Sequence, residues 1–252
     1  MKAIVALFAL AVMVRALMLM LIPFDGLYGQ DAFAYYDYSI VLRSALIHGQ
    51  PLPAFFWPIG FPLHLVFAYS VFGVHPLTAQ WVSIIAGALI APLTYLVARE
   101  CLLDLDQARA QRAGLVAGSI MIVTGQLMIS SLSIMSDVVA LAWAAASAWL
   151  LLRYHRQLRS IDLTLTVLSL SIAIMSRWAY ALLALPWTLS VLSRWHSQWP
   201  VIKLRRAIEL TSLTILIVGS VLLVPQILGV TRLGTFEVHG WNPINAVRTE
   251  VT

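Results

Sequence analysis

Acidic side chains are scarce in this chain, and Asp31 is the one whose position most suggests chemistry. Of the 252 residues, 11 are Asp or Glu, and Asp31 follows the first long apolar segment in the run Gly29-Gln30-Asp31. A carboxylate in this place could act as a general base, because it could accept a proton from a hydroxyl or an amine. Asp is also a preferred N-cap residue, so Asp31 could begin the helix that residues 32–48 predict. The two roles are compatible.

The elements that must position Asp31 are apolar helices. The chain is 61% hydrophobic and 11% charged, whereas soluble proteins are about 25% charged. Several apolar runs are long enough to cross a bilayer, which predicts an all-α, polytopic membrane protein. The basic residues lie in short clusters between these runs, where they orient helices rather than bind nucleic acid. The single cysteine, Cys101, excludes an internal disulfide, and no Cys/His spacing indicates a zinc site.

The positions of Lys and Arg predict the topology. Three connections are basic, 99–112, 153–159 and 194–206, and together with Lys2 they should be cytoplasmic. Residues 23–75 contain only Arg43 as a basic residue and should lie outside. The apolar segments that must connect these regions are 3–22, 59–74, 78–98, 114–132, 138–152, 163–192 and 208–228.

An even number of membrane crossings must separate any two cytoplasmic points. Three apolar segments lie between Lys2 and Arg99, so one of them cannot cross the membrane. Segment 59–74 would span roughly 24 Å as a helix, less than the ~30 Å hydrocarbon core, so we expect it to be re-entrant or to lie on the surface. Turns are expected at 130–137 and at 176–178, the latter dividing segment 163–192 into two short crossings. About seven crossings result, and the last delivers the tail to the outside. Asp31, Asp137, Arg177, His239 and Trp241 then share one face.

The chain is expected to form one membrane-embedded unit over residues 1–230, with a structured first external loop at about 23–77 and an external tail at 231–252. The loop is rich in aromatic residues, among them Tyr35, Tyr36 and Trp57. Such rings are typical of the membrane interface. They also stack on sugars and line grooves for lipid chains, because they combine apolar area with a polar edge.

Four features of the sequence together resemble one family. They are Gly29-Gln30-Asp31 with Tyr35-Tyr36 after the first apolar segment, Pro58-Ile59-Gly60-Phe61-Pro62, Ser133-Ile134-Met135-Ser136-Asp137 at the start of a membrane helix, and Met175-Ser176-Arg177 before a short apolar stretch. This order resembles membrane glycosyltransferases of the C-type fold, the protein mannosyltransferase and lipid A aminoarabinose transferase superfamily. The resemblance implies transfer of a sugar from a polyprenyl-phosphate carrier to an extracytoplasmic acceptor, with Asp31 as the base.

The resemblance also implies a cation for the departing phosphate, because that group is anionic. Arg177 is the first candidate, with Arg43, Arg232 and Arg15 behind it, since the guanidinium fork suits phosphate. Asp137, Tyr35, Tyr36, Trp57 and His239 are expected to support the site. Alternatively, Arg177 could pair with Asp137 and hold two helix turns together. Arg15 could also extend to a lipid headgroup.

Two departures from the family pattern bear on metal use and on completeness. Ala32 follows Asp31 where many relatives have a second acid, so metal dependence stays open, with Asp31, Asp137, His64 and His239 as candidate ligands of a divalent ion. Relatives continue through further helices or an external domain, so we expect either a truncated chain or a partner subunit that supplies the rest.

The alternatives are a lipid or sugar transporter or flippase, and a non-catalytic scaffold subunit. Transporters place polar groups at the midplane, often in repeats, whereas here charged groups gather at one face, which favours the enzyme. We expect a multi-pass protein of the cell (inner) membrane with its active site outside. The sequence identifies neither the sugar nor the acceptor.

Overall fold

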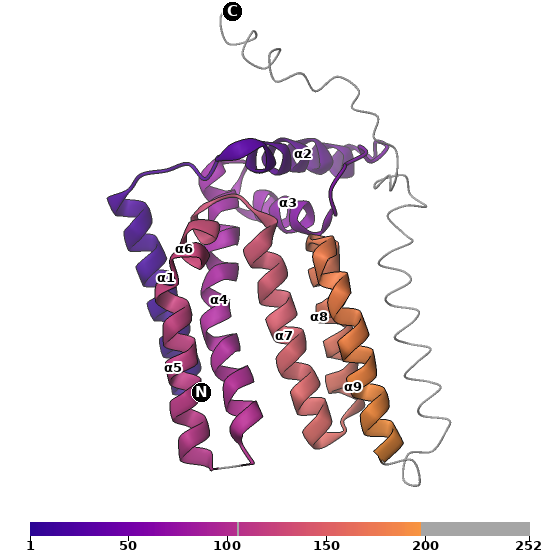
Figure 1. Cartoon of the computed structure of the whole chain (residues 1–252). Helices are drawn as coiled ribbons and strands as arrows, with labels where there is room; N and C mark the ends of the chain where they lie inside the picture. The colour runs from indigo at the N-terminus through magenta and orange to yellow at the C-terminus, as the bar shows by residue number, and fades with distance from the viewer. Residues whose placement is uncertain (105, 198–252) are drawn as a thin grey trace, which may run out of the picture.

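The computed structural model describes residues 1–104 and 106–197, and within these ranges every regular element is a helix (Figure 1). The expected crossing 208–228 and the tail with Arg232, His239 and Trp241 lie outside them. The elements are α1 (Lys2–Leu21), α2 (Gly29–His48), α3 (Gly60–Phe72), α4 (Pro76–Leu102), α5 (Gln107–Val123), α6 (Gly125–Leu132), α7 (Ser136–Gln157), α8 (Ser160–Ser176), the 3₁₀ helix η1 (Trp178–Leu183) and α9 (Ala184–Ser197).

Three helices of the described chain, α1, α4 and α7, are long and apolar enough to cross a membrane, and the bent pair of α5 and α6 makes a fourth candidate. The shorter apolar helices α8 and η1–α9 run alongside them (Figure 1). The chain is therefore an all-α polytopic membrane protein, as the sequence predicts. The chain turns at Arg177, between α8 and η1, as expected.

The helices α2 and α3 lie across one end of this bundle instead of crossing it (Figure 1). α3 has 13 residues, about 20 Å of helix, which agrees with the expectation that segment 59–74 does not span the bilayer. α7 begins and α8 ends at the same end of the bundle (Figure 1). The first loop therefore covers the region where Asp137 and Arg177 lie.

Segment 114–132 was expected to make one crossing, and the structure shows it as two helices with a bend between them. The helix breaks at Thr124, which has an extended backbone, and α5 and α6 meet at 55°. Thr124 Oγ1 donates a hydrogen bond to the carbonyl of Ile120, a contact that bends helices. The bend lets α6 turn across the end of α5 and leads the chain to Ser136 at the start of α7.

The helices pack closely because small residues lie between them. A Cβ built on Gly114 would lie 2.8 Å from the Tyr95 carbonyl of α4, and one on Gly118 would lie 2.9 Å from the Ala91 carbonyl. Such close approach is the usual way in which helices associate in lipid, where apolar burial alone gives little driving force.

Candidate active site

Asp31 lies in the first turn of α2 but does not cap it. The N-cap residue is Tyr28, and no side chain caps this end of the helix, so the capping role that the sequence left open for Asp31 is wrong. Asp31 is partly exposed, and within residues 1–104 and 106–197 its carboxylate has no hydrogen bond or ion pair. The dipole of α2 favours its negative charge. Asp31 is therefore an ionisable group that is free to accept a proton from a ligand.

Tyr35 connects Asp31 to the rest of the site. It lies one turn after Asp31 on the same face of α2 and is only 4% exposed. Its hydroxyl shares a 3.2 Å hydrogen bond with Ser136 Oγ at the start of α7. Burial raises the pKa of Tyr35, the hydrogen bond to Ser136 lowers it, and the charges of Asp31, Arg177 and Asp137 also act on it. The predicted acidic and basic residues of the site therefore all act electrostatically on the Tyr35 hydroxyl.

The aromatic residues of the first loop divide into two groups. Trp57 packs on Tyr35 with ring centroids 5.5 Å apart, and Phe55 lies 5.7 Å from the same ring. Tyr36 instead faces α3, where its ring meets Tyr69 at 6.0 Å. Trp57 thus packs against the Tyr35 ring of the site, whereas Tyr36 joins α2 to α3.

Asp137 and Arg177 form an ion pair, the structural alternative that the sequence leaves open. Arg177 Nη1 lies 2.5 Å from Asp137 Oδ1, and the two side chains are 45% and 36% exposed. A pair this exposed adds little to stability. Nη2 and Nε of Arg177 make no hydrogen bond to the described residues. The guanidinium can therefore stay paired with Asp137 and still donate to an anionic ligand.

The backbone before Arg177 rests against Gly60, the glycine of the Pro58–Pro62 element. A Cβ on Gly60 would lie 2.6 Å from the Met175 carbonyl carbon and oxygen and 2.7 Å from the Ser176 nitrogen. Only glycine allows α3 to approach α8 this closely. The contact of Gly60 with this backbone therefore fixes the position of Arg177 at the end of α8.

His64 has both of its ring nitrogens engaged. Nε2 accepts a 3.1 Å hydrogen bond from Trp143 Nε1, so Nδ1 carries the proton and donates to the Gly60 carbonyl at 2.7 Å. Both ring nitrogens of His64 are therefore occupied, so neither offers a free lone pair to a metal ion. In the described part of the chain no three His, Cys, Asp or Glu side chains are grouped so as to hold a metal ion.

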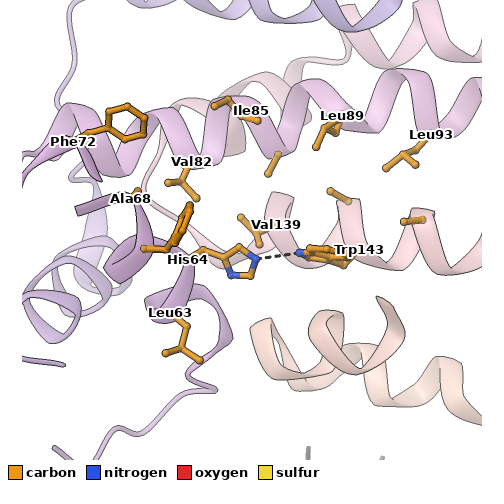
Figure 2. Close-up of a pocket in the computed structure, with 14 residues that line it drawn as sticks. Leu63, His64, Ala68, Phe72, Val82, Ile85, Leu89, Leu93, Val139 and Trp143 are labelled. Carbon is orange, nitrogen blue, oxygen red and sulfur yellow. Dashed lines mark hydrogen bonds between the residues drawn. The ribbon is translucent and has the colours of Figure 1, made fainter. Parts of the chain in front are cut away.

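An apolar groove of about 620 Å³ lies between α3, α4 and α7 (Figure 2). Its polar lining groups, His64 and Trp143, are bonded to each other (Figure 2). Ser136, the partner of Tyr35, lies three residues before Val139 on the same face of α7, so the groove leads away from the site. The other lining residues are Leu63, Phe67, Ala68 and Phe72 of α3, Val82, Ile85, Ala86, Leu89 and Leu93 of α4, and Val139, Ala142 and Ala146 of α7.

The groove was not predicted from the sequence. One signal was available, since Val139, Ala142, Trp143 and Ala146 follow helical spacing with small residues beside one large ring. That pattern is equally typical of a packed helix interface. Only the tilt of α3 across α4 and α7 shows that this row of α7 residues stays partly uncovered.

Two of the candidate cations lie away from this site. Arg15 is fully buried in the bundle and donates to Ser131 Oγ at 3.0 Å, so the expectation that it extends to a headgroup is wrong. Arg43 lies 12 residues after Asp31, roughly 18 Å further along α2. Of the described candidates, the structure brings together Asp31, Tyr35, Asp137 and Arg177.

The comparison with known families gives one match. The model of the dolichyl-phosphate-mannose-protein mannosyltransferase family matches residues 64–242. The matched region includes Asp137 and Arg177, whereas Asp31 precedes it. No curated protein and no solved structure matches the chain.

Proposed function

The chain belongs to the dolichyl-phosphate-mannose-protein mannosyltransferase family, and we propose that Asp31 is the base with which it transfers a sugar to an acceptor on the extracytoplasmic side of the cell membrane. The family is one of membrane glycosyltransferases that use polyprenyl-phosphate-linked sugars. The chain is therefore an enzyme of this class and not a transporter.

The proposed reaction is a displacement at the anomeric carbon of the donor sugar. A hydroxyl or amine of the acceptor loses its proton to the Asp31 carboxylate and forms the new bond to that carbon. The bond between the carbon and the phosphate oxygen breaks, and the electron pair leaves with the polyprenyl phosphate. The single observation that carries this proposal is the placement of an unpartnered carboxylate, Asp31, and an accessible guanidinium, Arg177, at the same end of the helix bundle.

Arg177 is proposed to hold the phosphate of the donor. Its Nη1 bond to Asp137 fixes the plane of the guanidinium, and the remaining N–H groups can donate to phosphate oxygens. The charge that develops on the leaving group is then stabilised by a cation already in place, so little reorganisation is needed during the reaction.

The groove is proposed to take the lipid part of the donor. Its volume of about 620 Å³ lies in the range of ligand pockets, and its lining is suited to a hydrocarbon chain. His64 joins the groove to the Gly60 carbonyl, and Gly60 in turn touches the backbone just before Arg177. A donor with its phosphate at Arg177 would thus have its chain directed into the groove.

The distribution of charge supports the proposed orientation of the site. The connections between α4 and α5 and between α7 and α8 lie at the end of the bundle away from α2 and α3 (Figure 1). Arg153 and Arg156 of α7 lie near that end and form ion pairs with Asp162 and Glu100. By the positive-inside rule these basic residues support a cytoplasmic position for this end and an external position for Asp31.

A groove-filling substitution tests the proposal. Membranes with the chain should transfer radiolabelled sugar from a polyprenyl-phosphate donor, and Ala142→Trp should raise the KM for that donor with little change in kcat. Leu141→Trp is the matched control, because Leu141 is 37% exposed and does not line the groove. Equal KM values for the two variants would contradict the proposed place of the lipid, and absence of chain-dependent transfer would contradict the function.

A further inference from the structure

Gln80 of α4 holds together the two loops that precede the helices of the site. Its side chain is fully buried. Nε2 donates one hydrogen bond to the Phe24 carbonyl and one to the Leu132 carbonyl, each at 2.8 Å. Phe24 lies in the loop that leads to α2 and Asp31, and Leu132 ends α6, just before the loop that leads to α7 and Asp137. The side-chain amide of Gln80 therefore binds both of the loops that lead to the site.

The two loops also contact each other at Gly26. The Ile134 amide donates to the Gly26 carbonyl at 2.9 Å. Gly26 has φ +82°, which favours glycine, and a Cβ there would lie 2.7 Å from Gln80 Cγ and 2.9 Å from Ile134 Cγ1. Gln80, Gly26 and Ile134 thus form a junction that admits no larger side chain at position 26.

The junction uses one end of the Gln80 amide and leaves the other end without a partner. Gln80 Oε1 is buried without a hydrogen-bond partner among the described residues, and such an atom costs roughly 1–3 kcal/mol. The amide cannot relieve this cost by turning over, because Oε1 would then face two carbonyl oxygens. Methionine has a similar shape and no such orphaned atom. Its substitution would also remove both hydrogen bonds to the loops, so Gln80→Met keeps the shape of the side chain and breaks the link between Phe24 and Leu132.

We propose that Gln80 is a positioning residue for sugar transfer, which sets the distance between Asp31 and the Asp137–Arg177 pair without touching the substrate. This inference rests on the proposed function. Ser136 lies four residues after Leu132 and bonds Tyr35 one turn from Asp31, so any shift between the two loops moves base and cation relative to each other. A misplacement of about 1 Å can cost roughly 100-fold in rate.

Gln80→Met tests the proposal with Ser83→Ala as its control. Ser83 is also buried on α4 with an unpartnered side-chain oxygen, but it bonds neither loop. For Gln80→Met we expect a lowered Tm, because two carbonyls lose their donor, together with a kcat lowered about 10- to 100-fold and a donor KM within a factor of about 3. Hydrogen exchange at Ile134 should become faster. Ser83→Ala should leave kcat and this exchange rate unchanged.

Several outcomes would overturn the proposal. A kcat for Gln80→Met equal to that of Ser83→Ala would do so, and so would unchanged hydrogen exchange at Ile134, which is measurable whether or not the protein transfers sugar. If Gln80→Met does not fold, Gln80→Asn retains an amide too short for both carbonyls and should fold with lowered kcat. Loss of folding in both variants would assign Gln80 to stability instead. Absence of transfer by the unsubstituted chain would count against the proposed function, and the exchange result would still decide the role of Gln80.

Discussion

Gly60→Ala should disturb the site through the backbone that carries Arg177. The substitution adds one methyl group at the contact between α3 and α8, where the new Cβ would lie 2.6 Å from the Met175 carbonyl carbon and oxygen. Both atoms belong to the backbone, so no side chain can rotate away to make room. The two helices must separate, and the residue next to the displaced segment is Arg177.

The size of the displacement follows from the geometry. Ordinary van der Waals contact begins at 3.4 Å, so the Met175 carbonyl must move by about 0.8 Å, the difference between 3.4 and 2.6 Å. Overpacking of this kind costs roughly 1–3 kcal/mol of stability. A shift approaching 1 Å at Arg177 should lower the transfer rate by up to about 100-fold.

The assay compares Gly60→Ala with Gly125→Ala in detergent and in membranes. Gly125 has nothing within 4 Å of its built Cβ, so the same substitution there should keep the parent's rate and Tm. Gly60→Ala should lower the rate of sugar transfer and the Tm. A Gly60→Ala protein with the rate and Tm of Gly125→Ala would refute the argument that this contact sets the position of Arg177.

The remaining predictions concern the phosphate contact, the response to alkali and the topology. Arg177→Lys should raise the donor KM about tenfold or more, because the fork of N–H donors is lost and a hydrogen bond to a charged group contributes about 1.5–3 kcal/mol; an unchanged KM would contradict this contact. Burial raises the pKa of Tyr38 from 10.0 to about 12, so the unfolded chain loses this proton first and stability should fall as the pH rises from 10 to about 12. Tyr38→Phe should have a Tm that depends less on pH in this window, and equal pH slopes would argue against the buried hydroxyl. With the exposed Cys101 replaced by serine, Gln50→Cys should react with an impermeant thiol reagent from outside and Ser160→Cys should not, and the reverse pattern would overturn the orientation.

The sequence predicts the helices well because lipid imposes a strong constraint on them. Apolar length and basic connections indicated the ends of the membrane helices, and the shortness of segment 59–74 indicated a helix that does not cross. The break at Thr124 was missed, because it adds no charge to the apolar run, and the hydrogen bond from Thr124 to the Ile120 carbonyl is of a kind that Ser and Thr also make inside unbroken helices.

The site was predicted in part. Parity placed Asp31, Asp137 and Arg177 at one end of the bundle, and they do lie there. The contacts that join them are tertiary and have no periodic signal, since Gly60 against Met175 and Gln80 between two loops each depend on how α3 and α4 meet other elements. His64 looked like a metal ligand by residue type, and only its two hydrogen bonds show that it is occupied.

The most direct test of the central claim is the transfer of radiolabelled sugar from a membrane lipid pool by the Asp31→Asn variant. Asp37→Asn is the matched control, because it makes the same change at an exposed position of the same helix. We expect Asp37→Asn to transfer label at the rate of the parent chain and Asp31→Asn to lose transfer while it inserts normally. Transfer by Asp31→Asn at the rate of the control would contradict the assignment of Asp31 as the base.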